Sequence, residues 1–239
     1  MINLQPRQIQ ILRAVISEFI ETAQPVGSDT IDKKYNIGVS PATIRNEMVQ
    51  LSKQDYLYKP HSSGGRMPTP KALRLYVNEL MREEELSVAD EVSAKEKIWN
   101  SRNELSDLLQ QTSSALASRA KAIGLAITEE SQVYHSGYAN LLEMPEFYDI
   151  EVMKRTLSII EQARLLNEIF SKAESYDKIQ IVYGKELGEK ELEPVGIMFI
   201  SVNALGHHCR LGVLGSKRFN YSYLVPMMKY FKSLIEQIV

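Results

Sequence analysis

Residues 28–66 read SDTIDKKYNIGVSPATIRNEMVQLSKQDYLYKPHSSGGR, and this stretch decides the fold of the N-terminal part of the chain. Ser28 is a favourable cap for a short helix that runs to Tyr35. Asn36-Ile37-Gly38 then supplies a turn, in which glycine tolerates a positive φ. Ser40-Pro41 is typical of the start of a further helix. Two helices joined by a short glycine-containing turn indicate a helix-turn-helix.

The second helix of this pair has an apolar face and a polar face. Its apolar face is predicted to be buried and consists of Ile44, Met48 and Leu51. Four hydrogen-bonding side chains point the other way: Thr43, Arg45, Asn46 and Gln50. Arginine pairs well with guanine and asparagine with adenine, whereas Ser40 and Thr43 suit phosphate or thymine-methyl contacts. This pattern favours DNA recognition. The alternative is a protein-docking module, since any exposed helix face is polar.

A predicted β-hairpin follows the recognition helix directly. Residues 56–59 have β-type composition, residues 60–65 form a turn-rich tip, and Arg66-Met67 begins the return strand. Such a hairpin is the wing of a winged helix. We expect phosphate contacts from Lys53, Lys59 and Arg66 and from the backbone of Ser62, Ser63 and Gly64. His61 at the tip fits either a phosphate contact or an ordinary hydrogen-bonded loop.

The periodicity of the remaining chain divides it into three predicted domains of an α+β protein. Residues 1–84 form the winged helix-turn-helix, which includes an amphipathic helix over 6–21 and a helix capped by Thr69-Pro70. Residues 85–127 are nearly free of glycine and proline, and predict a long helical connector of one or two helices that is a candidate dimerisation segment. Residues 128–239 predict helices at 149–172 and 223–239 and three strand-like runs in a small antiparallel sheet.

Charge is distributed unevenly along the chain. Residues 1–80 hold ten Lys/Arg and seven Asp/Glu, whereas residues 81–239 hold eighteen and twenty-three. Within 32–76 the basic excess is eight against three. A basic segment on an acidic body suits local contact with a polyanion.

Several other classes of protein find no support in the sequence. The chain has no apolar run long enough to span a membrane and no secretory signal pattern, and its single cysteine, Cys209, fits a cytoplasmic protein without disulfides. His207-His208-Cys209 makes a weak metal site, because neighbouring strand residues point to opposite faces. The Gly212–Lys217 segment lacks the spacing of a phosphate loop, and no nucleophile motif occurs. We therefore expect neither an enzyme nor a bound cofactor or metal.

Three N-terminal segments resemble signatures of the HrcA family of heat-inducible transcription repressors: residues 25–28, 39–46 and 60–69. Weaker similarity appears at 137–142, 145–147 and 212–221. The resemblance implies a winged-helix repressor with a C-terminal GAF-like domain. It implies a homodimer on an inverted repeat, the controlling inverted repeat of chaperone expression, and a GroEL-type chaperonin as a partner. Thr43, Arg45, Asn46, His61 and Arg66 match motif positions, so the resemblance gives them a DNA-contact role.

The chain departs from the family pattern in its middle region. It resembles a short form lacking about a hundred residues, and Thr128–Gln132 alone joins the two sides of the missing part. Ser216-Lys217 stands where relatives often carry Pro-Thr. The leading hypothesis is a repressor of heat-shock chaperone operons that binds double-stranded DNA as a homodimer, since twofold DNA requires a twofold protein. The alternative is a winged-helix regulator whose C-terminal domain binds a small molecule.

Overall fold

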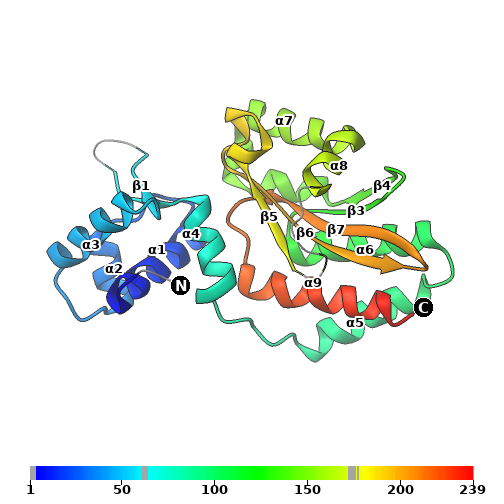
Figure 1. Ribbon diagram of the computed structural model, residues 1–239, viewed down its shortest axis with the longest axis horizontal. Helices are drawn as coiled ribbons and strands as arrows, with labels where there is room; N and C mark the ends of the chain where they lie inside the picture. Colours follow the sequence, from blue (N-terminus) through cyan, green and yellow to red (C-terminus); the bar gives the residue numbers. More distant parts are fainter. Residues whose placement is uncertain (1–3, 61–63, 172–175, 177, 239) are drawn as a thin grey trace. The chain divides into compact units, whose positions relative to one another are not determined.

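The computed structural model describes residues 4–60, 64–171, 176 and 178–238, which fall into two compact units, Met1–Arg82 and Glu83–Val239 (Figure 1). The elements of the first unit are, in order, α1 (Pro6–Thr22), α2 (Ser28–Tyr35), α3 (Pro41–Lys53), β1 (Leu57–Tyr58), β2 (Met67–Pro68), α4 (Pro70–Leu75) and the π-helical turn η1 (Tyr76–Leu80). Each of the helices and strands predicted here from the sequence is present.

Local sequence signals explain where these helices begin. Pro6, Pro41 and Pro70 occupy first-turn positions, where the missing backbone N–H costs nothing. The side chains of Ser40 and Thr69 each accept a hydrogen bond from the backbone N–H three residues further along the chain. Each such cap stabilises the helix by about 1 kcal/mol. A core of fully buried side chains then joins the helices: Ile11, Leu12, Val15, Ile16, Ile31, Ile44, Leu51 and Leu73.

The second unit is built on a five-stranded antiparallel sheet of order β4-β3-β7-β6-β5. Its strands are β3 (Ile123–Thr128), β4 (Val133–Ser136), β5 (Gln180–Tyr183), β6 (Val195–Ala204) and β7 (His207–Ser216). Its α-helices are α5 (Val88–Asn100), α6 (Leu105–Ala120), α7 (Ile150–Glu161), α8 (Ala163–Ser171) and α9 (Tyr221–Glu236). Short helical turns are η2 (Tyr138–Glu143), η3 (Pro145–Tyr148), η4 (Gly184–Leu187) and η5 (Lys190–Leu192).

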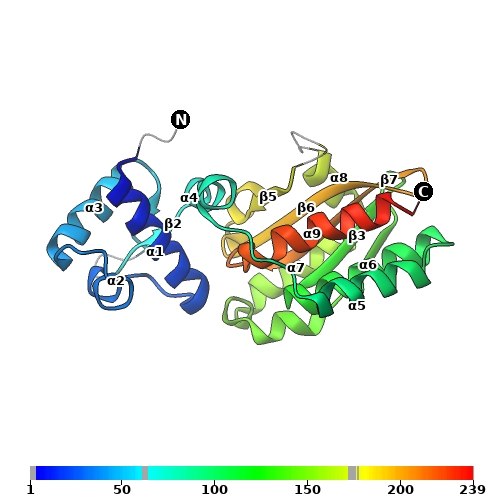
Figure 2. The ribbon, with the colours of Figure 1, turned by 90° about the horizontal axis from the view of Figure 1, so that it is seen from below.

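Helices cover both faces of this sheet (Figures 1 and 2). On one face, α7 and α8 pack against strand residues such as Leu125, Ile197 and Phe199 in a buried cluster. On the other face lie α6 and α9. α6 approaches β3 so closely that a Cβ on Gly124 would lie 1.9 Å from the carbonyl oxygen of Ser113, so only glycine fits there.

The α+β class is confirmed, with one error in the helical stretch predicted for 85–127. That stretch contains the two helices α5 and α6, but residues 123–127 belong to β3, and β4 was also missed. Ile123-Gly-Leu-Ala-Ile127 is a short apolar run, which periodicity alone cannot separate from a buried helix segment. Residues 128–132, which join the two sides of the missing part, comprise the last residue of β3 and the turn of the β3–β4 hairpin, with Thr128 N–H donating to the Gln132 carbonyl at 3.1 Å.

Candidate nucleic-acid interface

Helix α3 presents a polar face opposite a completely buried one. Ile44 and Leu51 are fully buried and Met48 nearly so. Arg45, Asn46 and Gln50 are exposed, and within the described part of the chain their side chains make no hydrogen bond or ion pair. Donors on a rigid helix that are not engaged by the protein itself are free to meet base edges.

The start of α3 is organised by its cap. The Ser40 hydroxyl accepts from the Thr43 N–H at 3.2 Å and lies 3.0 Å from the Thr43 hydroxyl. Both residues were predicted to contact DNA. In the free protein their hydroxyls are joined to each other, although Ser40 remains exposed.

Two carboxylates fix the orientation of α3 and α2 on α1. Glu47 on α3 accepts from the Arg7 Nε at 3.0 Å and from Gln8 Nε2 at 3.1 Å. Glu18 on α1 is buried and accepts from the Lys34 Nζ at 2.9 Å and the Tyr35 hydroxyl at 3.3 Å. Burial, reinforced by Glu18, raises the pKa of Tyr35 to about 12, so this phenol stays a hydrogen-bond donor.

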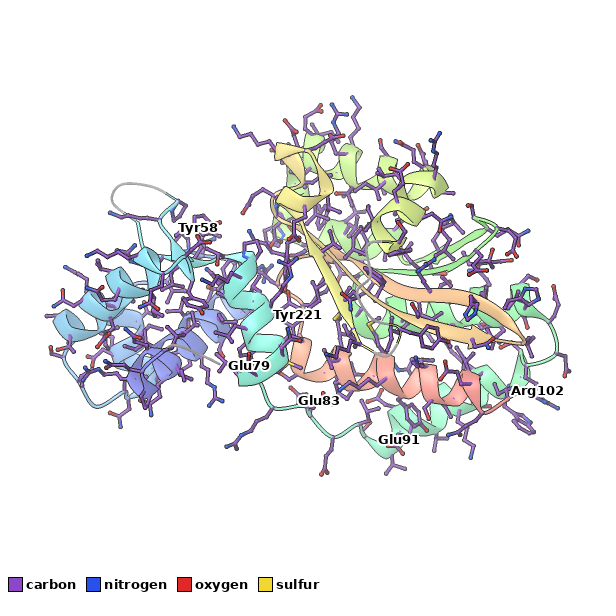
Figure 3. The ribbon with its side chains drawn as sticks, viewed as in Figure 1. Tyr58, Glu79, Glu83, Glu91, Arg102 and Tyr221 are labelled. Atoms are coloured by element: carbon purple, nitrogen blue, oxygen red, sulfur yellow. The ribbon has the colours of Figure 1, made fainter. Side chains whose placement is uncertain are left out.

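The wing is tied to the loop before α2. β1 and β2 pair through Leu57↔Pro68 and Tyr58↔Met67, and Figure 3 labels Tyr58 on β1. Arg66 exchanges two backbone hydrogen bonds of 2.9 Å with Val26. A Cβ on Gly65 would lie 2.5 Å from the Val26 carbonyl, so this close approach requires glycine.

Arg66 has a structural role that its position in the sequence did not reveal. Its Nη1 donates to the Ser52 hydroxyl on α3 at 2.7 Å, which joins the wing to the recognition helix. Ser52 was missed as a partner because nothing in the sequence marks a contact across fourteen residues. Lys53 and Lys59 are exposed. His61, Ser62 and Ser63, also predicted to contact DNA, lie outside the described residues.

A polar hollow of about 380 Å³ lies between the recognition helix and the wing. It is lined by Arg45 of α3, by Lys59 and Arg66 of the wing, and by residues 26–29, which end the loop and begin α2. Asp29 is the acidic residue among those that line it. Three cations against one carboxylate give a concave surface that attracts phosphate.

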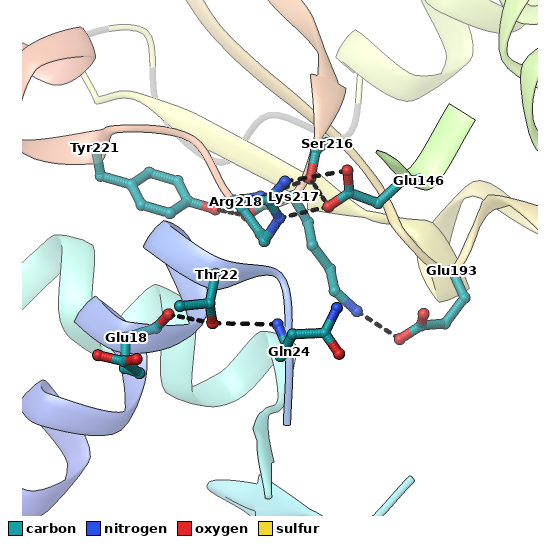
Figure 4. A network of polar contacts seen from close by, with 9 residues as sticks. All are labelled: Glu18, Thr22, Gln24, Glu146, Glu193, Ser216, Lys217, Arg218 and Tyr221. Atoms are coloured by element: carbon teal, nitrogen blue, oxygen red, sulfur yellow. Dashed lines mark hydrogen bonds and ion pairs between the residues drawn. The ribbon is translucent and has the colours of Figure 1, made fainter. Parts of the chain in front are cut away.

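Residues of the motif at 212–221 form part of a separate polar network in the second unit (Figure 4). Arg218 pairs with Glu146 through two nitrogens, one at 3.1 Å, and the Ser216 hydroxyl donates to the same carboxylate at 2.8 Å. Lys217 pairs with Glu193. Burial opposes ionisation of Glu146, but the bonds from Arg218 and Ser216 outweigh it and lower the pKa of this carboxyl. The network joins η3 to the end of β7 and is structural.

The described residues contain no group of three or more histidine, cysteine or acidic side chains placed to hold a metal ion. Among the described helices, none is both long and apolar enough to cross a membrane.

The fold has a close counterpart among solved structures. A crystal structure of a hypothetical protein matches with a TM-score of 0.78 and 18% identity, covering 99% of this chain and 98% of that one. The likeness shows that this two-unit chain fold also occurs in an experimentally determined protein.

Comparison with known sequences shows the family. The heat-inducible transcription repressor HrcA of Pelotomaculum thermopropionicum is 25% identical over 338 positions, covering 99% of this chain and 97% of that protein. Since this chain has only 239 residues, the alignment has gaps on its side, and the chain is shorter than these relatives. The HrcA of Acetivibrio thermocellus is 33% identical over 236 positions, covering 98% of this chain and 64% of that protein. The family model of the HrcA protein C-terminal domain matches residues 62–225. This chain therefore belongs to the HrcA family of transcription repressors.

Proposed function

We propose that this chain represses heat-shock chaperone operons by binding an inverted-repeat operator as a homodimer. The observation that carries the proposal is the exposed group Arg45, Asn46 and Gln50 on α3, whose side chains bond to no other described residue, beside a hollow lined by three cations. In this proposal α3 enters the major groove and the wing lies against the backbone.

The test is fluorescence anisotropy with an inverted-repeat duplex and a scrambled duplex of equal composition, at several salt concentrations. The inverted repeat is expected to bind more tightly at every salt concentration, because base contacts survive the screening that weakens phosphate contacts. Equal affinity for the two duplexes would contradict specific repression. A GroEL-type chaperonin partner is tested in the same assay, where added GroEL is expected to tighten operator binding.

The homodimer part of the proposal rests on α5. Ala94 and Ile98 are buried on one side of this helix, whereas Val88 (76% exposed), Val92 (58%) and Trp99 (56%) share a separate, exposed side at helical spacing. α6, the other helix of the predicted dimerisation segment, is instead largely buried against the sheet. An exposed apolar row on a surface helix is typical of a helix–helix interface.

The charges beside this apolar row favour a second copy of this chain as the partner that packs against it. In an antiparallel pair with its twofold axis at the middle of the row, Val88 faces Trp99 of the partner subunit. Glu91, on the flank of the row, then lies beside Lys95 of the partner subunit, so each interface gains two opposite-charge pairs. Figure 3 labels Glu91 on this helix and Arg102 just beyond its end. One pair of helices buries less surface than the roughly 1,000 Å² of a stable interface. We therefore expect a weak dimer, which is strengthened when both subunits bind adjacent half-sites of the operator.

Trp99 is the single tryptophan of the chain and reports on this interface directly. Its emission is expected to shift to the blue as protein concentration rises, in parallel with the mass measured by sedimentation. Trp99→Glu should shift the protein to monomer and weaken operator binding about tenfold or more. Tyr148→Glu is the matched control, since Tyr148 is also an exposed aromatic residue of this unit. Unchanged sedimentation of Trp99→Glu would exclude α5 as the interface.

A further inference from the structure

A second hollow, of about 650 Å³, lies in the C-terminal unit, and none of its lining residues is among those assigned to DNA. One wall is η2, with Tyr138, Ala139 and Leu142. The other is one face of α7, where Met153, Leu157 and Glu161 recur at intervals of four residues. The volume lies within the range of small-molecule sites.

The walls of this hollow are mainly apolar and partly exposed. Met153 and Leu157 pack with their inner sides on the buried sheet cluster, and their remaining surface faces the hollow. Leu142 is 65% exposed. Apolar side chains that the fold leaves uncovered around a concave surface are characteristic of a binding site.

One end of the hollow carries a charge. Glu161 is the charged residue among those that line it. The Tyr138 phenol is close enough for burial and the Glu161 carboxylate to raise the pKa of this tyrosine, and its ring lies 5.0 Å from that of His135. A carboxylate beside aromatic rings attracts an ammonium group by ion pairing and by cation–π contact, whereas it repels a carboxylate or phosphate.

We propose that this hollow binds a small apolar molecule with a cationic amine head, the tail lying on Leu142, Met153 and Leu157 and the head at Glu161. Charge also argues against a second copy of this chain here, because the Glu161 carboxylates of two copies would repel each other. The hollow shares no lining residue with the proposed DNA contacts or with α5.

The experiment uses the full chain and the neutral fluorophore N-phenyl-1-naphthylamine, displaced by dodecylamine, dodecan-1-ol or dodecanoate below their micelle concentrations. The fluorophore is expected to bind, and dodecylamine to displace it at concentrations about tenfold lower than the other two. Glu161→Gln should abolish that preference while leaving dodecan-1-ol unchanged. Glu151→Gln, on the same helix but outside the hollow, is the matched control and should keep the preference.

Ala139→Trp tests the place of binding, because Ala139 is exposed and its enlargement fills the hollow without disturbing the core. Loss of fluorophore binding with an unchanged thermal unfolding midpoint supports the proposal. Unchanged binding in this variant, or equal displacement by dodecanoate and dodecylamine, overturns it. A fall in sedimenting mass of Ala139→Trp also overturns it, since the hollow would then be an interface between copies.

Discussion

At the residue scale, Arg45 and Lys59 are expected to contribute to operator binding in different ways. Arg45→Ala should lose about 1–3 kcal/mol of discrimination between operator and scrambled DNA, because arginine reads guanine through two hydrogen bonds. Lys59→Ala should weaken both duplexes alike and lower the slope of affinity against salt. The exposed Arg13 of α1 lines a different hollow with Tyr35. Arg13→Ala is therefore the matched control, because it removes one positive charge from the same unit outside the proposed DNA contacts. If Arg45→Ala weakened both duplexes equally, α3 would not be reading bases.

At the scale of elements, the Glu146–Arg218 pair joins η3 to the segment that follows β7, and both side chains are 13% exposed. The pKa of Glu146 is lower in the folded protein than the ordinary 4.5. The stabilisation is therefore present above about pH 4.5 and is lost as pH falls through the folded pKa. Glu146→Gln should lower the free energy of unfolding by about 1–3 kcal/mol at pH 7. The variant's free energy of unfolding should also fall less steeply as the pH is lowered. Urea unfolding at pH 7 and pH 4 measures both effects, with the exposed Glu143→Gln as control. An equally steep acid dependence in Glu146→Gln would assign it to other carboxylates.

At the scale of the whole molecule, residues 83–239 contain the complete five-stranded sheet and both of its helical layers. We therefore expect this fragment to fold alone. Cys209 is 2% exposed, and burial, with help from Glu130 and Glu129, raises its pKa to about 11. In the folded fragment at neutral pH, its reaction with Ellman's reagent should be about a hundredfold slower or more than after unfolding in urea, because the thiolate is the reactive form. A fragment that reacts at the unfolded rate would show that it needs residues 1–82.

How far the sequence alone reaches differs between the two units. In the first unit, caps, first-turn prolines and helical periodicity are local signals, so α1 to α4 and the wing strands were predicted within a few residues. The exposed side of α3 followed from the same periodicity, and Arg45, Asn46 and Gln50 lie there as expected. The family followed from short motifs in the same region.

What the sequence did not determine depends on contacts between distant residues. β3 was missed because Ile123–Ile127 is a short apolar run whose strand conformation depends on pairing with β4 and with β7, and β7 lies more than eighty residues away. The Arg66–Ser52 bond and the Val26–Arg66 pairing that anchor the wing likewise carry no local signal. The apolar hollow between η2 and α7 exists only because the sheet holds two separate segments side by side. By itself, the sequence determined the helices and wing strands of the first unit and the polarity of their faces, since these depend on neighbours a few residues apart. Only the tertiary structure decided how the wing is anchored, which face of α5 is left uncovered and where the second hollow forms, because each depends on how helices and turns pack on the rest of their unit.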